Sequence, residues 1–317
     1  MASCFTEDES KSVASLGEGG LIRRFCSNLA PLVPPSPFGS GDDCAVIGSC
    51  LFSGNILATC DPVILGRHFA PDTPARLAGK KLLNRNISDI AAMGGKPKFA
   101  LASCIISPKT SLEWLDLFCA GLKEAAEIFG VKFVGGDVAR GPSDFFSACV
   151  TLLGEAETVL LRSGAKAGDK IFVTGALGAS FESGRHLDFS PKVAEGLFLA
   201  KSACATSCTD ISDGLASDLR DILNPAISAK IKADSIPVFD FPGNNLEKAL
   251  CDGEDYELLF TLDSGAEKAD FLSAFKRKLG YLPVEIGEIV PRSDSEILIE
   301  TGGALRALEA RGFSHFC

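Results

Sequence analysis

Residues 55–95 read NILATCDPVILGRHFAPDTPARLAGKKLLNRNISDIAAMGG, and they decide the fold class because they join a strand to a helix. The first seven residues, 55–61, are typical of a strand. In the part that follows, Thr73 is a suitable helix N-cap and Pro74 suits the first helical position. Apolar residues then recur at helical spacing until Gly94, a typical helix stop.

The same signals continue along the chain and change character near residues 154–160. At 317 residues the chain is long for one core, so two domains are expected. Strands and helices mix without strict alternation, which predicts a mixed α/β (α+β) fold with domains at 1–154 and 155–317. We expect further strands at 131–136, 145–154, 170–175, 256–262, 284–290 and 296–300, and helices at 111–130, 213–223 and 265–279.

Composition excludes several classes of protein. The net charge of −10 argues against general nucleic-acid binding, which relies on a basic surface. No apolar run approaches the roughly 20 residues of a membrane span, and the acidic, polar N-terminus does not resemble a secretory signal. The twelve cysteines contain no CxxC pair, so we expect a cytoplasmic protein with reduced, mostly buried thiols.

Aspartates recur at places that often line clefts. They follow glycines, stand at the expected ends of strands, lie on the helix of residues 73–95 or open the helix near residue 213: Asp42, Asp43, Asp61, Asp89, Asp137, Asp210 and Asp213. Each alone is also typical of a helix cap or a solvated turn. The residues by themselves leave open whether these carboxylates converge.

If they converge, cations must compensate their charge. Oxygen ligands without His or Cys favour Mg²⁺, Mn²⁺ or Ca²⁺ over zinc. A calcium-binding helix–loop–helix starting at Asp210 does not fit, because Leu215 falls where a glycine is required. Magnesium usually shares its carboxylates with substrate phosphates, yet neither a P-loop nor a protein-kinase loop occurs. The pattern therefore indicates phosphate chemistry that relies on metal ions.

Eight ordered motifs resemble those of thiamine-monophosphate kinases and together cover about residues 18–316. They are GSGDDCAVI, GRHFAPD, NISDIAAMGGKP, GGDVARGP, LRSGAKAGDKIFVTGALG, DISDGLASDL, DGEDYELLFT and GFSHF. GDD and DISDG also occur in a wider superfamily that includes aminoimidazole ribonucleotide synthetase, selenophosphate synthetase and HypE. GEDYELLFT and the terminal GFSHF resemble the thiamine-phosphate branch specifically.

The resemblance implies ATP-dependent phosphorylation of thiamine monophosphate to thiamine diphosphate, with several Mg²⁺ ions. By position, the residues similar to magnesium ligands are Asp43, Thr59, Asp61, Asp89, Asp137, Asp210 and Asp213, of which Asp43, Asp89, Asp210 and Asp213 are expected to be catalytic. Those similar to ATP contacts are Gly136, Asp137, Arg162 and Ser212. Those similar to contacts with thiamine monophosphate are His68, Glu254 and Phe313.

The resemblance also implies a homodimer in which the N-terminal domains pair their sheets. The N-terminal domain would bind ATP and Mg²⁺, and the C-terminal α/β domain would complete the active site. Only small molecules are expected as substrates, with no nucleic acid and no membrane.

Some positions depart from the family pattern. Cys60 stands where a second hydroxyl residue is common and Pro62 where a Thr is common. Val138 and Ala139 replace two threonines, and Asp252 replaces a glycine. The stretch between Gly178 and Pro191 is short, and Lys192 stands where an Arg is usual. Two alternatives therefore stay open: a sister enzyme such as aminoimidazole ribonucleotide synthetase, or a nucleotide-binding protein with weakened turnover.

Overall fold

The computed structural model describes residues 2–34, 47–309 and 312, and the chain divides into two compact units. The first comprises Met1–Ile90 and Lys96–Glu155, and the second comprises Ala91–Gly95 and Ala156–Cys317. Both units combine sheets with helices, so the predicted mixed α/β fold is confirmed. Within the described ranges, no helix is long and apolar enough to cross a lipid bilayer.

The first unit is built on a four-stranded sheet in the order β1-β4-β2-β3. Its strands are β1 (Asn55–Ile64), β2 (Lys96–Ile106), β3 (Lys132–Arg140) and β4 (Phe146–Ala156). β2 pairs parallel with β3 and antiparallel with β4. Strand β4, the last in sequence, therefore lies between the first two, and β1 and β3 form opposite edges of the sheet.

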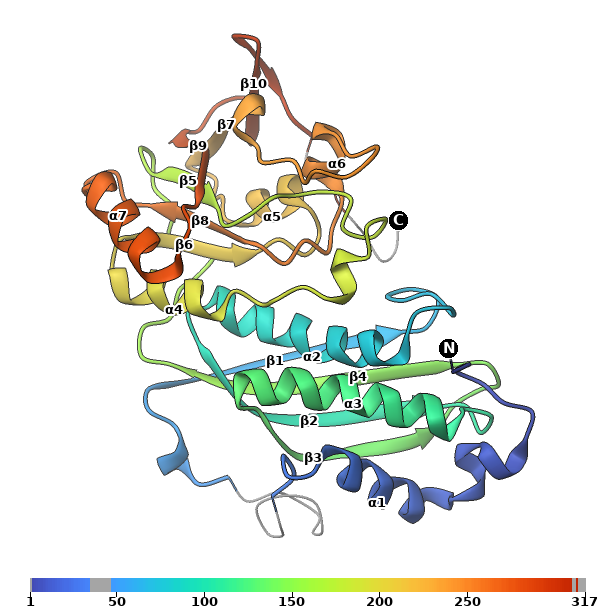
Figure 1. The fold of residues 1–317 in the computed structure, drawn as a ribbon. Helices are drawn as coiled ribbons and strands as arrows, with labels where there is room; N and C mark the ends of the chain where they lie inside the picture. Colours follow the sequence, from blue (N-terminus) through green and yellow to red (C-terminus); the bar gives the residue numbers. More distant parts are fainter. Residues whose placement is uncertain (1, 35–46, 310–311, 313–317) are drawn as a thin grey trace. The chain divides into compact units, whose positions relative to one another are not determined.

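Helices α2 (Ala75–Ala92) and α3 (Leu112–Phe129) lie side by side over one face of this sheet (Figure 1), with α1 (Gly17–Leu29) beside α3. Two glycines let α2 and α3 approach closely. A Cβ on Gly79 would lie 2.0 Å from the carbonyl oxygen of Phe118, and one on Gly121 would lie 1.9 Å from that of Arg76. Short 3₁₀ turns occupy Glu9–Lys11, Val13–Ser15 and Ser49–Leu51.

The ends of these helices test the sequence prediction in detail. Ser111 caps α3 by accepting the amide of Trp114, and Gly130 ends it in a left-handed conformation, as expected. The predicted N-cap of α2 was wrong, because the Thr73 hydroxyl instead accepts the amide of Ala70 in the preceding turn. Helix α2 starts at Ala75, so Pro74 precedes its first residue.

The face of the sheet away from these helices is partly apolar and open in the isolated chain. Along β4 every second residue is buried, and the residues between are only partly covered. On this open face the large apolar side chains of Ile56, Leu101 and Ile105 are exposed.

The cysteines of the described ranges are free thiols. On the open face of the sheet the sulfur atoms of Cys60 and Cys149 lie 3.3 Å apart. Of the ten cysteines in the described ranges, four are buried, so the expectation of mostly buried thiols was wrong.

The second unit contains a seven-stranded sheet in the order β11-β10-β7-β9-β5-β8-β6. Only β10 and β7 pair parallel among its registered neighbours. The strands are β5 (Lys170–Val173), β6 (Ala205–Asp210), β7 (Ile227–Lys232), β8 (Leu258–Leu262), β9 (Val284–Pro291), β10 (Ile297–Thr301) and β11 (Ala304–Ala307). The helices are α4 (Val193–Ser202), α5 (Leu215–Asp221), α6 (Leu246–Cys251) and α7 (Lys268–Leu279), with 3₁₀ turns at Arg185–Leu187 and Ala233–Ser235.

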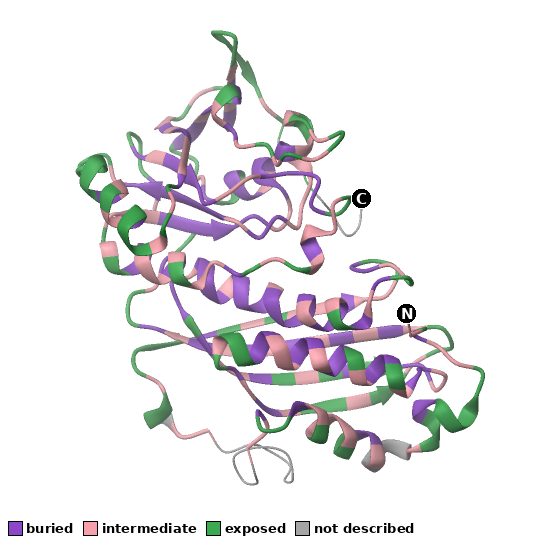
Figure 2. Ribbon diagram, viewed as in Figure 1, coloured by how far each residue is buried: buried purple, intermediate pink, exposed green. Residues whose placement is uncertain are grey.

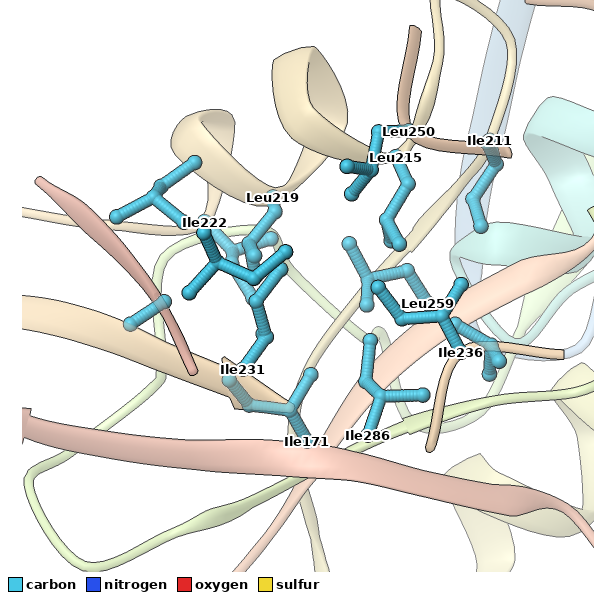
Figure 3. Packing of buried hydrophobic residues seen from close by; sticks show 14 of the residues in the cluster. Ile171, Ile211, Leu215, Leu219, Ile222, Ile231, Ile236, Leu250, Leu259 and Ile286 are labelled. Carbon is cyan, nitrogen blue, oxygen red and sulfur yellow. The ribbon is translucent and has the colours of Figure 1, made fainter. Parts of the chain in front are cut away.

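The central strands of this sheet contribute to two apolar cores, one on each face. Along β5 the side chains of Ile171 and Val173 belong to one core, and that of Phe172 belongs to the other. Figure 3 shows the first core, where Leu215 and Leu219 of α5 pack over the sheet. The second core is aromatic and lies against α4 and α7. Strand β8 is buried at all five positions, as Figure 2 also shows, so it carries no solvent-facing side chain.

Candidate functional site

In the first unit, three of the predicted metal ligands lie where β1 meets α2. The Thr59 hydroxyl on β1 donates a hydrogen bond to the Asp89 carboxylate on α2. Asp61 is two residues farther along β1 and therefore points to the same side of the sheet. Asp61 lies within β1, not at the predicted end of a strand, because β1 continues to Ile64.

Two residues of α2 that the sequence analysis did not single out hold Asp61. The Asn86 amide oxygen accepts the backbone N–H of Asp61 at 3.0 Å, and Asn86 is fully buried. The Nε atom of Arg85 lies 3.6 Å from the Asp61 carboxylate, and its guanidinium also donates to the carbonyl of Pro62 at 2.6 Å. Arg85 thus supplies a positive charge next to Asp61. Both residues stand in the motif NRNISD, directly before Asp89 in sequence.

Asp137 does not join this group. It lies within β3, paired with Ser103 of β2, and both side chains are exposed. Strands β1 and β3 are three steps apart in the sheet, which corresponds to roughly 14 Å. Within one chain, Asp137 and the Thr59–Asp61–Asp89 group therefore occupy opposite edges of the sheet.

Gly136 has a structural reason to be glycine. A Cβ there would lie 1.9 Å from the carbonyl oxygen of Ala102 on the neighbouring strand. Gly136 and Asp137 also line a groove between β2, β3 and α1. Its walls are mainly apolar and include Ile22, Phe25 and Val138.

His68 is buried in the turn after β1. Its Nδ1 atom accepts the backbone N–H of Ile64 at 3.0 Å, and its carbonyl accepts the Lys81 ammonium at 2.7 Å. These contacts give His68 a local structural role, and the ligand contact that the resemblance implies stays a prediction.

In the second unit, the motifs DISDG and GEDYE lie side by side. The amide of Tyr256 donates to the carbonyl of Ile211, and that of Glu254 donates to the carbonyl of Ser212, both at 2.8 Å. Gly253 is required here, since a Cβ on it would lie 2.4 Å from the Ser212 carbonyl oxygen. The backbone thus brings Ser212 next to Glu254, two predicted ligand contacts far apart in sequence.

Three carboxylates gather at the start of α5. Asp210 is the buried last residue of β6, and Asp213 lies in the turn before Leu215. Asp218, not singled out from the sequence, accepts the amides of Asp213 and Gly214 at 3.1 Å each. Burial first, and then the charges of Asp210 and Asp213, raise the pKa of Asp218 to about 8.

Arg162 and Gly312 lie near the same turn. Arg162 forms an ion pair with Asp221 at 3.2 Å, with both side chains largely exposed. The charge of Arg162 also lowers the pKa of Asp218, although less than burial raises it. Near the C-terminus, Gly312 packs against the Asp213 carbonyl oxygen and Ser217. The remaining predicted site residues, Asp43 and Phe313, lie outside the described residues.

The donor chemistry at both places suits a hard divalent cation. At β1 and α2 the ligands are oxygen atoms of a hydroxyl and two carboxylates, because Cys60 points to the opposite face of the sheet. At α5 the charges of Asp210 and Asp213 add to the effect of burial in raising the pKa of Asp218, and a cation would offset the repulsion between these carboxylates. Across the described ranges, however, no three acidic, His or Cys side chains already surround one position.

Comparison with known proteins defines the class first. Residues 41–156 match the family described as AIR synthase related protein, N-terminal domain. The structure of E. coli HypE aligns over 94% of this chain and 98% of its own, with a TM-score of 0.76 and 18% identity. The fold is therefore that of the AIR synthase-related proteins.

The chain belongs, more narrowly, to the thiamine-monophosphate kinase family. It is 33% identical over 306 residues to the thiamine-monophosphate kinase of Buchnera aphidicola subsp. Acyrthosiphon pisum, covering 88% of this chain and 92% of the relative. It is 32% identical over 333 residues to that of Escherichia coli K12, covering 95% and 98%.

Solved structures of the same family agree. The thiamine-monophosphate kinase of Stenotrophomonas maltophilia K279a aligns with a TM-score of 0.72 and 28% identity, covering 90% of this chain and 96% of its own. The structure described as AaThiL complexed with AMPPCP and TMP aligns with a TM-score of 0.71 and 28% identity, covering 96% and 98%.

Proposed function

We propose that the protein transfers the γ-phosphoryl group of ATP to thiamine monophosphate, giving thiamine diphosphate and ADP. The observation that carries this proposal is family membership over nearly the whole chain. The oxygen atoms of Thr59 and Asp89, and the carboxylates of Asp210, Asp213 and Asp218, support it because their chemistry suits Mg²⁺. A related structure holds AMPPCP and TMP, which are an ATP analogue and the proposed acceptor.

The acceptor chemistry explains why the site is rich in aspartate. The second pKa of a phosphate monoester is near 6, so the acceptor is largely ionised at pH 7 without a general base. The main barrier is repulsion between two polyanions, and catalysis then depends on positioning and charge neutralisation. Mg²⁺, when bound, would neutralise the negative charge of the phosphates.

We assign roles to residues of each unit. In residues 1–154, Thr59, Asp61 and Asp89 would hold Mg²⁺ at the β1–α2 contact, and Asp43 would add a carboxylate. Asp137 would hold Mg²⁺ at the opposite edge of the sheet, because β3 lies three strands from β1. In residues 155–317, Asp210 and Asp213 would hold Mg²⁺ at the start of α5. Arg85 would screen Asp61 until the ion binds, because its guanidinium is already 3.6 Å away.

We assign the nucleotide contacts separately within each unit, following the family pattern. Gly136 and Asp137 line the mainly apolar groove between β2, β3 and α1, so we place the adenosine part of ATP there. Arg162 and Ser212 would contact the phosphates, since a guanidinium offers a fork of donors. Glu254, Phe313 and His68 would contact thiamine monophosphate.

We further propose a cytoplasmic homodimer. The open face of the first unit's sheet exposes Ile56, Leu101 and Ile105, and pairing with the same face of a second copy would bury them. Free thiols in the described ranges are consistent with a reducing compartment.

The decisive experiment measures ADP release when thiamine monophosphate is added to protein, ATP and Mg²⁺. Thiamine diphosphate should accumulate in the same amount as ADP. Turnover of a different phosphorylated acceptor, with thiamine monophosphate ignored, would instead identify a sister enzyme of the AIR synthase-related class.

A further inference from the structure

Two segments of the second unit contact each other residue by residue. The segment 180–192 follows β5, and the segment 254–257 leads into β8. Arg185 forms an ion pair with Asp255 at 2.7 Å, and Lys192 forms one with Glu257 at 3.1 Å. The ring of Phe189 stacks on that of Tyr256, with 3.9 Å between their centroids. His186 lies 3.0 Å from the Glu254 carboxylate, so each residue of 254–257 has a partner in the segment 180–192.

The backbone of 254–257 depends on these contacts. Glu254 has φ of 64° and Tyr256 has φ of 53°, left-handed conformations that residues other than glycine seldom adopt. Such conformations persist only where surrounding contacts hold them, and they concentrate at functional sites. The Ser180 hydroxyl donates to the Glu254 carbonyl at 2.7 Å and helps to hold this turn.

His186 fixes the side chain of Glu254. Its Nδ1 atom lies 3.0 Å from a carboxylate oxygen of Glu254, within hydrogen-bonding distance. Because a carboxylate only accepts, Nδ1 carries the proton of this contact. The His186 side chain is 4% exposed, whereas that of Glu254 remains 22% exposed. The carboxylate is therefore oriented from the protein side and still accessible from solvent.

Phe181 adds an aromatic surface beside this pair. Its ring stacks on the His186 ring with 4.4 Å between centroids and 18° between planes. Phe181 nevertheless remains 54% exposed. A large apolar ring held in place by a buried histidine, and largely open to solvent, is suited to stack on the flat ring of a ligand.

We propose that Phe181, His186 and Glu254 form a subsite for a flat, cationic heteroaromatic ring. Phe181 provides the stacking face, Glu254 the countercharge, and His186 is a positioning residue that orients both. Resting on the proposed function, this assigns the subsite to the aminopyrimidine and thiazolium rings of thiamine monophosphate, which combine planarity with positive charge. The segment 180–192 then determines acceptor specificity in this chain.

The test of Phe181 uses Phe181→Ala, with Leu305→Ala as a matched control. Leu305 is 50% exposed and lies on β11, an edge strand of the seven-stranded sheet that is four strands away from β5, the strand that precedes Phe181. Phe181→Ala should raise both KM and the calorimetric Kd for thiamine monophosphate about 5- to 30-fold. KM for ATP and kcat should remain unchanged, and Leu305→Ala should match the wild type. An unchanged Kd and KM in Phe181→Ala would overturn the stacking role.

The test of His186 relies on rescue. Asparagine can place an amide N–H near the position of Nδ1, whereas alanine and leucine cannot. His186→Ala and His186→Leu should raise KM for thiamine monophosphate about 10-fold with little change in KM for ATP, and His186→Asn should restore most of the loss. Thermal unfolding shows whether each variant is folded. If folded His186→Asn is as impaired as folded His186→Leu, the positioning role is wrong.

The same measurements separate this subsite from the proposed function. If the wild type neither binds nor phosphorylates thiamine monophosphate, the proposed function is wrong, and the ligand assigned to the subsite is wrong as well. If the wild type is active and the Phe181 and His186 variants have the same KM and Kd for thiamine monophosphate as the wild type, only the proposed subsite is wrong.

Discussion

The Thr59 hydroxyl on β1 donates a hydrogen bond to the Asp89 carboxylate on α2, which links a strand to the helix that covers it. Asp89 lies one turn after Arg85 and Asn86, the two residues that hold Asp61. The contact therefore places a hydroxyl and two carboxylates on one side of β1. If Asp89 only capped or solvated its helix, the Thr59 hydroxyl and the Asp61 carboxylate would not need to lie on the same side of β1.

The first prediction concerns Asp89. Asp89→Asn keeps the size of the side chain and a partner for Thr59 but removes the charge. We expect kcat to fall at least about 100-fold, because a metal ligand positions the reacting phosphates. The matched control is Asp72→Asn, an exposed aspartate in the turn before α2, which should behave as wild type. If kcat fell only about tenfold or less, with normal Mg²⁺ dependence, Asp89 would have a structural role and would not be a metal ligand.

The second prediction concerns the metal ions. ATP turnover should cease in EDTA and recover when Mg²⁺ is added, because clustered carboxylates and two polyanions require compensating charge. Isothermal titration calorimetry gives an independent measurement, since Mg²⁺ should bind the wild type and bind Asp213→Asn more weakly even without ATP. Full activity in the chelator would contradict the metal-dependent mechanism.

The sequence predicted which segments form helices and strands better than it predicted which strands lie next to each other in the sheet. Ser111 and Gly130 bound α3 as expected, because caps and helical periodicity are local signals. The position of β4 between β1 and β2 depends on pairing between distant segments. The sequence therefore could not show that Asp137 lies on the edge of the sheet opposite Asp61.

The candidate site shows the same limit. The motifs DISDG and GEDYE were recognisable separately, but the hydrogen bonds that join Ser212 to Glu254 are long-range. Asp218 lies five residues after Asp213 in a motif already singled out, so its acidic spacing was a usable signal. His186 had no such signal, because only the folded chain brings it within 3.0 Å of Glu254.

The third prediction concerns stability at the contact between α2 and α3. In Gly121→Ala the new Cβ would lie 1.9 Å from the carbonyl oxygen of Arg76, and a helix backbone cannot move aside as a flexible side chain can. We expect the free energy of unfolding to fall by at least about 2 kcal/mol, measured by urea denaturation. Gly48→Ala is the control, since among the described residues its Cβ would meet only the Cys50 sulfur, at 3.4 Å, and its effect should stay within about 0.5 kcal/mol. Equal effects of the two substitutions would mean that the helices do not approach as closely as described.

The last prediction separates the two substrates through Glu254. Glu254→Gln keeps a side chain that His186 can still contact but removes the negative charge. If this charge faces the cationic acceptor, KM for thiamine monophosphate should rise roughly 5- to 30-fold while KM for ATP stays the same. Phe313→Ala should have a similar effect, because Phe313 matches an acceptor contact in the family pattern. Glu247→Gln on α6 is the control, since Glu247 is acidic, exposed and in the same unit. Steady-state kinetics with each substrate varied in turn decide the matter. Weaker ATP binding with normal acceptor binding would place Glu254 at the nucleotide, because a lost countercharge weakens only the ligand that it faces.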